Sequence, residues 1–116
     1  MKIIELIPGT SFRIRLGEVF VYLHYEPSTH GINDWRASFP GASMGASTIS
    51  MALLDARGLW ERHGKPSLSR YCGPEPTDIT LDDLLALAKP WEREIIGRIF
   101  GVYQGPLEEF SRDQAG

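Results

Sequence analysis

Two runs of alternating residues, separated by a two-residue linker, constrain the fold of this chain more than any other feature. In residues 11–16 apolar and polar side chains alternate, and residues 19–25 continue the pattern with apolar residues on both faces. Gly17-Glu18 between the runs fits a two-residue hairpin loop, because its first position needs a positive φ that glycine adopts without strain. We therefore predict two antiparallel strands, and Phe20 on the second face makes the second strand central or covered on both sides.

Further segments predict a third strand, a helix and an extended connector. Residues 35–39 predict the strand, and the small residues of 40–48 are expected to form a flexible tract. Apolar residues at helical spacing from Ile49 to Ala56 predict a helix that is capped by Ser47 or Thr48. Gly58 either ends this helix or lies within it, and residues 64–66 close the region. The prolines and glycines of 64–79 predict an extended connector.

The last part of the chain predicts two helices that share one apolar face. Thr80 and Asp83 have the spacing of a capping box at the start of this segment. Pro90 disfavours a continuous helix, yet the apolar stripe keeps its phase across it, so we expect two helices that meet at a corner or a kink. The stripe consists of Leu81, Leu84, Leu85, Ala88, Trp91, Ile95, Ile96, Ile99, Phe100 and Tyr103.

These elements predict an α+β fold, with an N-terminal antiparallel β-meander of three to four strands packed against C-terminal helices. The length of 116 residues suits a single domain, which we place at residues 1–106. Gly105-Pro106 is expected to end the last helix, and residues 107–116 are expected to form a flexible tail. Since three strands cannot bury both faces of a sheet alone, we expect the helices to cover one face.

Composition and charge exclude several classes of function. The net charge is −3 and no cluster of basic residues occurs, so binding to duplex nucleic acid or to an anionic membrane is not expected. No apolar run approaches the length of a membrane span, and Glu5 interrupts the segment where a signal peptide would be apolar. The single cysteine, Cys72, suits a reducing compartment, so we expect a soluble cytoplasmic protein.

One short motif points to hydrolase chemistry. Residues 41–45 match the G-x-S-x-G pattern of a nucleophile elbow around Ser43, and Asp55 and His63 follow in the order that α/β-hydrolases use. The chain is too short for the parallel sheet of that fold, so small residues before a helix explain the match better. A Cys72–His63 pair is the other form of this hydrolase alternative.

The remaining candidate ligands do not form a recognisable metal site. His24, His30, His63 and Cys72 show none of the paired spacings that are typical of zinc sites. We therefore expect no metal, no cofactor and no catalytic residue.

A second function class rests on basic residues in the predicted strands. Arg13 and Arg15, together with Arg36, predict a basic stripe on one sheet face. Tyr22 and Trp35 lie close in sequence and would suit stacking with the bases of a single-stranded nucleic acid. The alternative is a solvated face in which the arginines pair with glutamates of neighbouring strands.

The leading hypothesis is a non-enzymatic protein–protein interaction module, meaning an assembly factor, an adaptor or an inhibitor. Three tryptophans, four tyrosines and five phenylalanines are a large aromatic content for this length, and such residues dominate binding hot spots. The partner would be another protein or a second copy, and nucleic acid is an unlikely partner. The predicted partner-binding residues, in the C-terminal half, are Trp60, Trp91, Ile99, Tyr103 and Phe110.

The run Thr-Leu-Asp-Asp-Leu-Leu at residues 80–85, followed by a second short helix, resembles the C-terminal parts of small phage tail-assembly chaperones. The resemblance covers at most residues 77–103. It implies an origin in a phage or mobile element, a role in assembly, and a location in the cytoplasm of a bacterial host.

Overall fold

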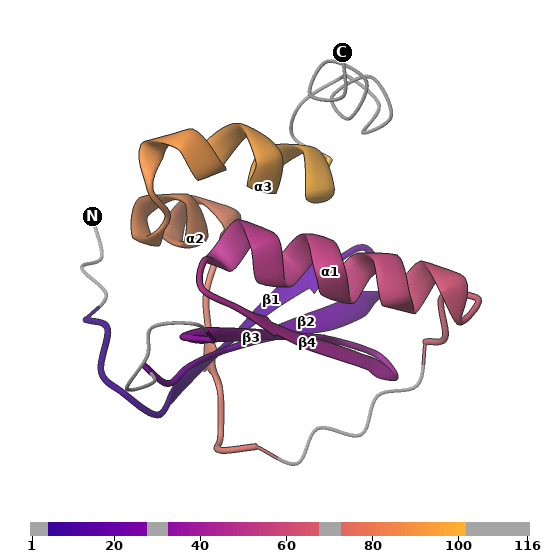
Figure 1. The fold of residues 1–116 in the computed structure, drawn as a ribbon, viewed down its shortest axis with the longest axis horizontal. Coiled ribbons are helices and arrows are strands. Elements are labelled where there is room, and N and C mark those ends of the chain that lie inside the picture. The colour runs from indigo at the N-terminus through magenta and orange to yellow at the C-terminus, as the bar shows by residue number, and fades with distance from the viewer. Residues whose placement is uncertain (1–4, 28–32, 68–72, 102–116) are drawn as a thin grey trace.

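A computed structural model describes residues 5–27, 33–67 and 73–101, in which a five-stranded sheet carries all the α-helices on one face (Figure 1). The strand order is β4-β3-β2-β1-β5. The strands are β1 (Thr10–Leu16), β2 (Val19–Tyr25), β3 (Trp35–Phe39), β4 (Ala42–Ala46) and β5 (Thr77–Asp78). The helices are α1 (Ile49–Arg62), α2 (Leu81–Leu87), the 3-10 helix η1 (Pro90–Glu92) and α3 (Arg93–Ile99). The α+β fold predicted from sequence is confirmed.

The first hairpin forms where the alternating runs predict it. β1 and β2 pair antiparallel from Thr10 opposite Tyr25 to Leu16 opposite Val19. Gly17, the first residue of the connecting loop, has a φ of 59°. β2 lies in the middle of the sheet, as its two apolar faces predict.

Two strands lie in segments that we expected to be irregular. The tract 40–48, predicted to be flexible, contains β4, which pairs antiparallel with β3 after a tight turn at Gly41 (φ 75°). Alanine, serine and glycine have low strand propensity, so pairing with β3 and cover by α1 decide the conformation of this segment. The extended connector ends in β5, which pairs parallel to β1 beside Phe12 and Arg13.

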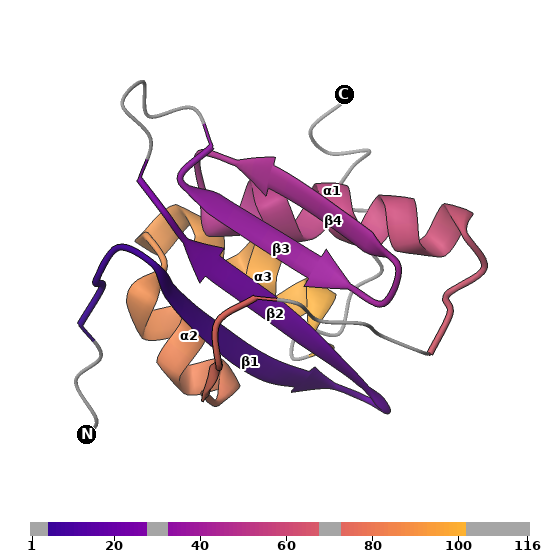
Figure 2. The ribbon, with the colours of Figure 1, turned by 90° about the horizontal axis from the view of Figure 1, so that it is seen from below.

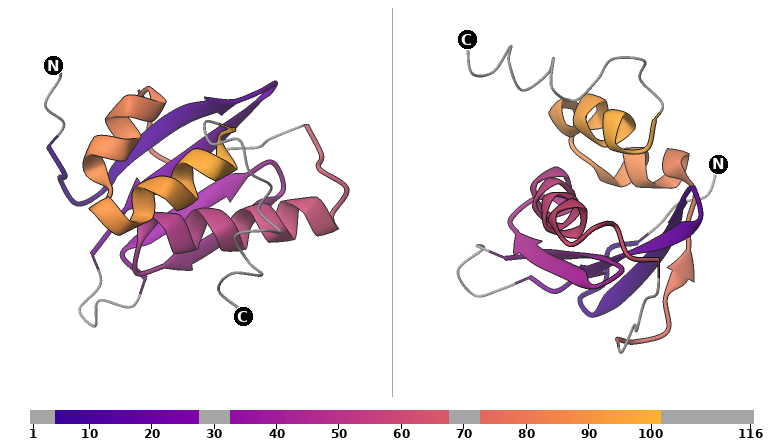
Figure 3. Two further views of the ribbon diagram at one scale, coloured as in Figure 1. Left: turned by 90° about the horizontal axis from the view of Figure 1, so that it is seen from above. Right: turned by 90° about the vertical axis from the view of Figure 1, so that its right-hand side faces the viewer.

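α1 starts at Ile49, as the sequence predicts, and of the two alternatives for Gly58 the structure has the one in which this glycine lies within the helix. Thr48 is its N-cap and accepts a hydrogen bond from the backbone N–H of Met51 at 3.3 Å. The helix continues through Gly58 to Arg62, because apolar contacts with the sheet outweigh the low propensity of one glycine. α1 packs over β3 and β4 (Figure 3, right).

The C-terminal helices meet at the predicted corner. Thr80 and Asp83 form the predicted capping box, with hydrogen bonds of 3.1 and 3.0 Å. Pro90 opens η1 after the extended residue Lys89, so the chain turns there before α3 begins. α3 ends at Ile99, where Gly101 has a φ of 79°, and the prediction that it ends at residues 105–106 is wrong.

A buried carboxylate joins the C-terminal helices to α1. Glu92 is 2% exposed, and its Oε1 accepts hydrogen bonds from the backbone N–H and the hydroxyl of Ser50, both at 2.9 Å. Its Oε2 accepts the backbone N–H of Lys89 at 2.9 Å. Since Ser50 lies in the first turn of α1, Glu92 places negative charge at the N-terminal end of that helix, where it is stabilising.

The longest helix among the described residues is α1, with 14 residues, and none of the described helices is long and apolar enough to cross a membrane.

Candidate functional site

The helices leave one face of the sheet without helical cover, and we call it the helix-free face (Figure 2). The strand register aligns side chains on this face across the sheet: Arg13 opposes Tyr22, which opposes Ser38, which opposes Ser43. The residues of this face are Ser11, Arg13 and Arg15 of β1, Phe20, Tyr22 and His24 of β2, Arg36 and Ser38 of β3, Ser43 and Gly45 of β4, and Asp78 of β5.

Arg13 forms a two-point ion pair on this face. Its Nε lies 2.6 Å from one carboxylate oxygen of Asp78 and a terminal nitrogen lies 2.9 Å from the other. The hydrogen bonds from Arg13 lower the pKa of Asp78, and the same contact raises the pKa of Arg13 above its ordinary value. The partner is therefore an aspartate of β5, and not one of the glutamates that the sequence suggested.

Phe20 lies close to two guanidinium groups. The Cζ atoms of Arg13 and Arg15 lie 4.6 and 5.6 Å from the centre of its ring. The Nε of Arg15 also donates to the carbonyl of Gly17 at 2.9 Å, which holds its side chain near the hairpin loop. Phe20 nevertheless keeps 37% of its surface exposed. Planar groups thus gather at this end of the helix-free face.

Arg36 extends over the edge strand β4. A terminal nitrogen of its guanidinium donates to the hydroxyl of Ser43 at 3.2 Å, and that hydroxyl lies 3.0 Å from the Oγ of Ser38. A Cβ added to Gly45 would lie 3.4 Å from the other terminal nitrogen, so glycine leaves room for the guanidinium. Arg36 itself is exposed.

The placement of Ser43 contradicts the nucleophile-elbow interpretation. Ser43 lies within an edge strand and not at a turn from strand to helix, and its hydroxyl contacts Arg36 and Ser38. Asp55 and His63 belong to α1 and its C-cap, on the opposite face of the sheet. Cys72, the other proposed nucleophile, lies outside the described residues.

The predicted aromatic neighbour of Tyr22 faces the other way. Trp35 is buried on the helix-covered face, where its ring centre lies 4.9 Å from that of Tyr25 and 6.5 Å from that of Phe12. Adjacent strand residues point to opposite faces, so Trp35 and Arg36 cannot share one. The aromatic residue that shares a face with Tyr22 is Phe20, and the alternation of residues 19–25 could have shown it.

A second contact on the helix-free face was not predicted. The hydroxyl of Ser11 lies 2.8 Å from the Nδ1 of His24 on the neighbouring strand. Ser11 is almost fully buried, so this hydrogen bond orients the His24 ring and does not offer a nucleophile to solvent.

The structure corrects the predicted protein-docking surface of the C-terminal half. Trp60 is buried against Phe39, with ring centres 5.2 Å apart, and its Nε1 donates to the carbonyl of Pro66 at 2.9 Å. Ile99 is 4% exposed, because α3 turns it into the core. Neither residue presents a surface to a partner. Trp91 does, with 56% of its surface exposed.

Tyr103 and Phe110, the other two predicted docking residues, and His30, a candidate ligand, lie outside the described residues.

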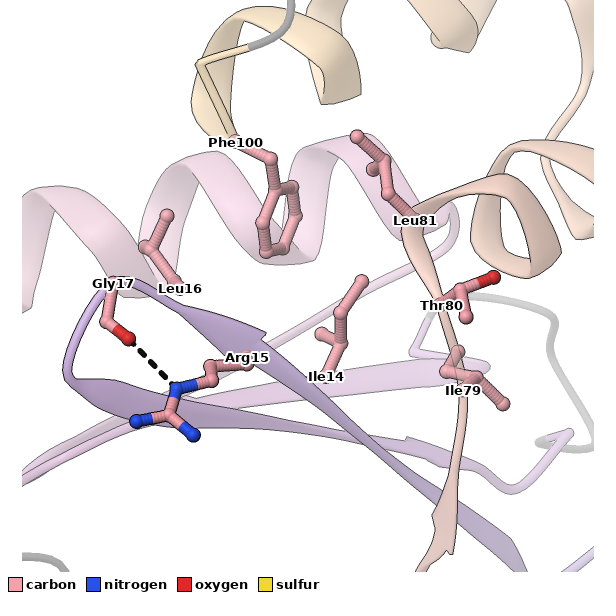
Figure 4. Close-up of a pocket in the computed structure, with 8 residues that line it drawn as sticks. All are labelled: Ile14, Arg15, Leu16, Gly17, Ile79, Thr80, Leu81 and Phe100. Carbon is pink, nitrogen blue, oxygen red and sulfur yellow. Dashed lines mark hydrogen bonds between the residues drawn. The ribbon is translucent and has the colours of Figure 1, made fainter.

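A hollow of about 410 Å³ lies between the end of β1, the start of α2 and the end of α3 (Figure 4). Phe100 lies between Leu16 and Leu81 in this view, and the guanidinium of Arg15 turns back to Gly17. The hydroxyl of Thr80 is engaged in the helix cap. The lining is therefore mainly apolar, without a grouping of acid, base and nucleophile.

Within residues 5–27, 33–67 and 73–101, no three His, Cys, Asp or Glu side chains lie close enough together to hold a metal ion.

Comparison of the chain with protein-family models, curated proteins and solved structures found no match. The resemblance to phage tail-assembly chaperones therefore stays an expectation, and the function has to be inferred from the geometry alone.

Proposed function

We propose that this protein is a non-enzymatic binding module whose helix-free face binds single-stranded nucleic acid. One observation carries the proposal: folding brings Arg13, Arg15, Tyr22 and Arg36 to one face that the helices leave uncovered. Sequence alone favoured a protein partner and made nucleic acid unlikely. We rank nucleic acid first here, because Trp60 is buried and because two properties of the helix-free face favour a nucleic acid.

The first fact is the distribution of charge. On the paired strand residues of this face, three arginines face one acidic side chain, Asp78, while Glu26 and Asp34 lie just beyond the ends of β2 and β3. The whole chain carries −3, so the strands of this face are more positive than the chain as a whole. A local potential of this kind attracts a phosphate backbone even when the protein is acidic overall.

The second fact is the set of planar groups. Phe20 and Tyr22 lie on the central strand, and the guanidinium of Arg15 stays next to the Phe20 ring. Bases of a single strand stack on aromatic rings and on guanidinium planes, whereas the bases of a duplex are already stacked on each other. The combination suits an unpaired strand better than a duplex.

Part of the chain also approaches this face. Residues 73–76 reach β5 from the helix-free side (Figure 1). Arg15 near the hairpin loop and Arg36 with Ser43 near the opposite edge remain exposed. We expect the single-stranded nucleic acid to contact these two exposed ends of the helix-free face.

The test is fluorescence anisotropy with labelled single strands of about ten nucleotides, set against a duplex of the same sequence. Two arginine–phosphate contacts, from Arg15 and Arg36, predict that log K falls against log salt with a slope of about −1.4, at ~0.7 per contact. Arg15→Ala and Arg36→Ala should each weaken binding about three- to tenfold and reduce the slope by ~0.7. Phe20→Ala should weaken binding with little change in slope.

Arg62→Ala is the matched control, because it removes an exposed arginine from α1 on the other side of the sheet. It should leave binding nearly unchanged. The proposal fails if single strands do not bind at low salt, or if the Arg62 variant loses as much affinity as the Arg36 variant.

A second candidate function, docking of a protein partner at Trp91, is supported by one observation. An indole with 56% of its surface exposed is unusual, and tryptophan is enriched in binding hot spots. Ile7 is exposed to the same fraction on the N-terminal segment, so Ile7→Ser is a matched control for Trp91→Ala. A partner retained by the wild type and by Ile7→Ser, but lost by Trp91→Ala, supports docking there. Equal retention by all three contradicts it.

A further inference from the structure

The two edges of the sheet differ in how they are protected against pairing. β5 is two residues long, follows Pro76 and contains the charged Asp78. β4, at the other edge, has the sequence Ala-Ser-Met-Gly-Ala, without charge or proline. Charges, prolines and very short strands are the means by which edge strands normally avoid pairing with other chains. Among the described residues no strand pairs with the outer edge of β4, and its own sequence has none of these protections apart from its modest length.

The hairpin geometry fixes which groups of β4 face outward. Phe39 and Ala42 flank a two-residue turn. In such a hairpin the flanking residues form a hydrogen-bonded pair, and the opposed pairs alternate from there along the ladder. Ser43 and Gly45 therefore direct their N–H and C=O groups away from β3, toward the free edge. An antiparallel partner strand must therefore have free backbone N–H and C=O groups opposite Ser43 and Gly45.

We propose that β4 pairs antiparallel with β4 of a second copy of this chain, in the register centred on Met44. In this register Ser43 opposes Gly45 of the second copy, and Gly45 opposes Ser43, so both outward-facing residues exchange their hydrogen bonds. In a register centred on Ser43, or in one centred on Gly45, only one of these two outward-facing residues forms backbone hydrogen bonds with its equivalent in the other copy. The backbone pattern thus selects the Met44-centred register.

Side chains fit the same register. Ala42 opposes Ala46 of the second copy, and Met44, which is half-buried on the helix side, opposes its own equivalent. No charged residue opposes another across this pair of strands. The second copy is therefore the occupant that this edge fits, and the paired sheets would form one continuous helix-free face.

The helices are compatible with this pairing. Because α1 packs over both β3 and β4, its axes in the two copies would lie about two strand spacings apart, roughly 10 Å, which is a normal helix-packing distance. Leu59 follows Ser50 by nine residues, or two and a half helical turns, so it lies on the side of α1 away from Glu92. This half-buried leucine faces the helix of the second copy.

Sedimentation velocity over a range of protein concentrations tests the proposal, independently of any nucleic acid. We expect a reversible dimer that Ser43→Pro and Ser43→Lys abolish, because proline removes an outward N–H and lysine is typical of protected edges. Ser43→Thr, which keeps the N–H and the hydroxyl, should dimerise like the wild type. Circular dichroism of each variant shows whether it is folded.

Two further readouts distinguish this dimer from other associations. Met44→Cys in a Cys72→Ser background should form an intermolecular disulfide, because residue 44 opposes itself at a Cα distance of roughly 4.5 Å. Ala42→Cys should not, because residue 42 opposes residue 46. Added salt should not weaken the dimer, because Arg36 of each copy lies over β4 and salt screens their repulsion.

A monomer at every concentration contradicts the proposal. In that case the outer edge of β4 could pair only with an extended segment of another protein. A dimer that survives both Ser43→Pro and Ser43→Lys, or that salt disrupts steeply, contradicts it as well.

Discussion

At the scale of single residues, the Arg13–Asp78 ion pair connects the first strand to a segment 65 residues later. Both side chains are partly exposed, so the contact contributes modestly to stability. The ion pair matters for position, because it fastens β5 to β1 at the edge of the sheet and leaves Arg13 beside Phe20.

This ion pair predicts a dependence of stability on pH. Arg13 lowers the pKa of Asp78 in the folded state below the ordinary value of 3.8. The contribution is therefore present in full above that value and is lost as the pH falls through the folded pKa. We expect wild type to exceed Asp78→Asn in urea midpoint at neutral pH and the two to converge in acid. A midpoint difference that is the same at every pH would contradict this assignment.

Ile99 tests whether the stripe of the last helices is core or interface. It is almost fully buried, so Ile99→Asp should cost about 4 kcal/mol or more and unfold much of the protein. Met51→Asp is the control, since Met51 is largely exposed on α1 and should unfold at nearly the wild-type denaturant concentration. A folded Ile99→Asp variant that had lost a partner would instead make the stripe an interface.

At the scale of elements, the Glu92–Ser50 contact determines how the C-terminal helices dock on α1. Glu92→Ala removes the acceptor of two backbone N–H groups and one hydroxyl, so we expect a loss of about 2–4 kcal/mol in the free energy of unfolding. Glu92→Gln keeps one accepting oxygen and should lose less.

Chemical denaturation measures both effects, and Glu94→Ala is the matched control. Glu94 pairs with Arg98 on the exposed side of α3, and its removal should cost at most about 0.5 kcal/mol. Equal losses at positions 92 and 94 would show that the buried carboxylate does not hold the helices together.

Elements that depend on local signals could be predicted from the sequence. Alternation and Gly17 predicted the first hairpin, and Thr80 with Asp83 predicted the start of α2. β4 could not be predicted in this way. Its small residues have low strand propensity and form a strand because they pair with β3 and are covered by α1. β5 was missed for a similar reason, since a two-residue strand has no periodicity of its own.

The candidate site divides in the same way. Alternation placed Arg13, Arg15 and Arg36 on strands, and the register then set them on one face. The contact of Arg13 with Asp78 forms because the connector after α1 ends in β5, which pairs with β1. The alternation within each segment does not indicate that pairing. Burial of Trp60 depends on its contact with Phe39 of β3, which is distant in sequence, so the docking surface was overestimated.

At the scale of the whole molecule, the fold has two unequal faces. The helices bury the apolar side of the sheet, while arginines and aromatic rings remain on the other side. A second copy at β4 would extend this face without changing its chemistry. Binding and self-association are thus separate consequences of one layered arrangement.

The most direct test of the central claim is a map of amide chemical shifts in an isotope-labelled sample titrated with an unlabelled single strand. We predict that the changes concentrate in β1, β2, β3 and β4 and in the Nε signals of Arg15 and Arg36. Changes confined to α2, η1 and α3 around Trp91, or no changes at low salt, would contradict the assignment of the helix-free face as the binding surface.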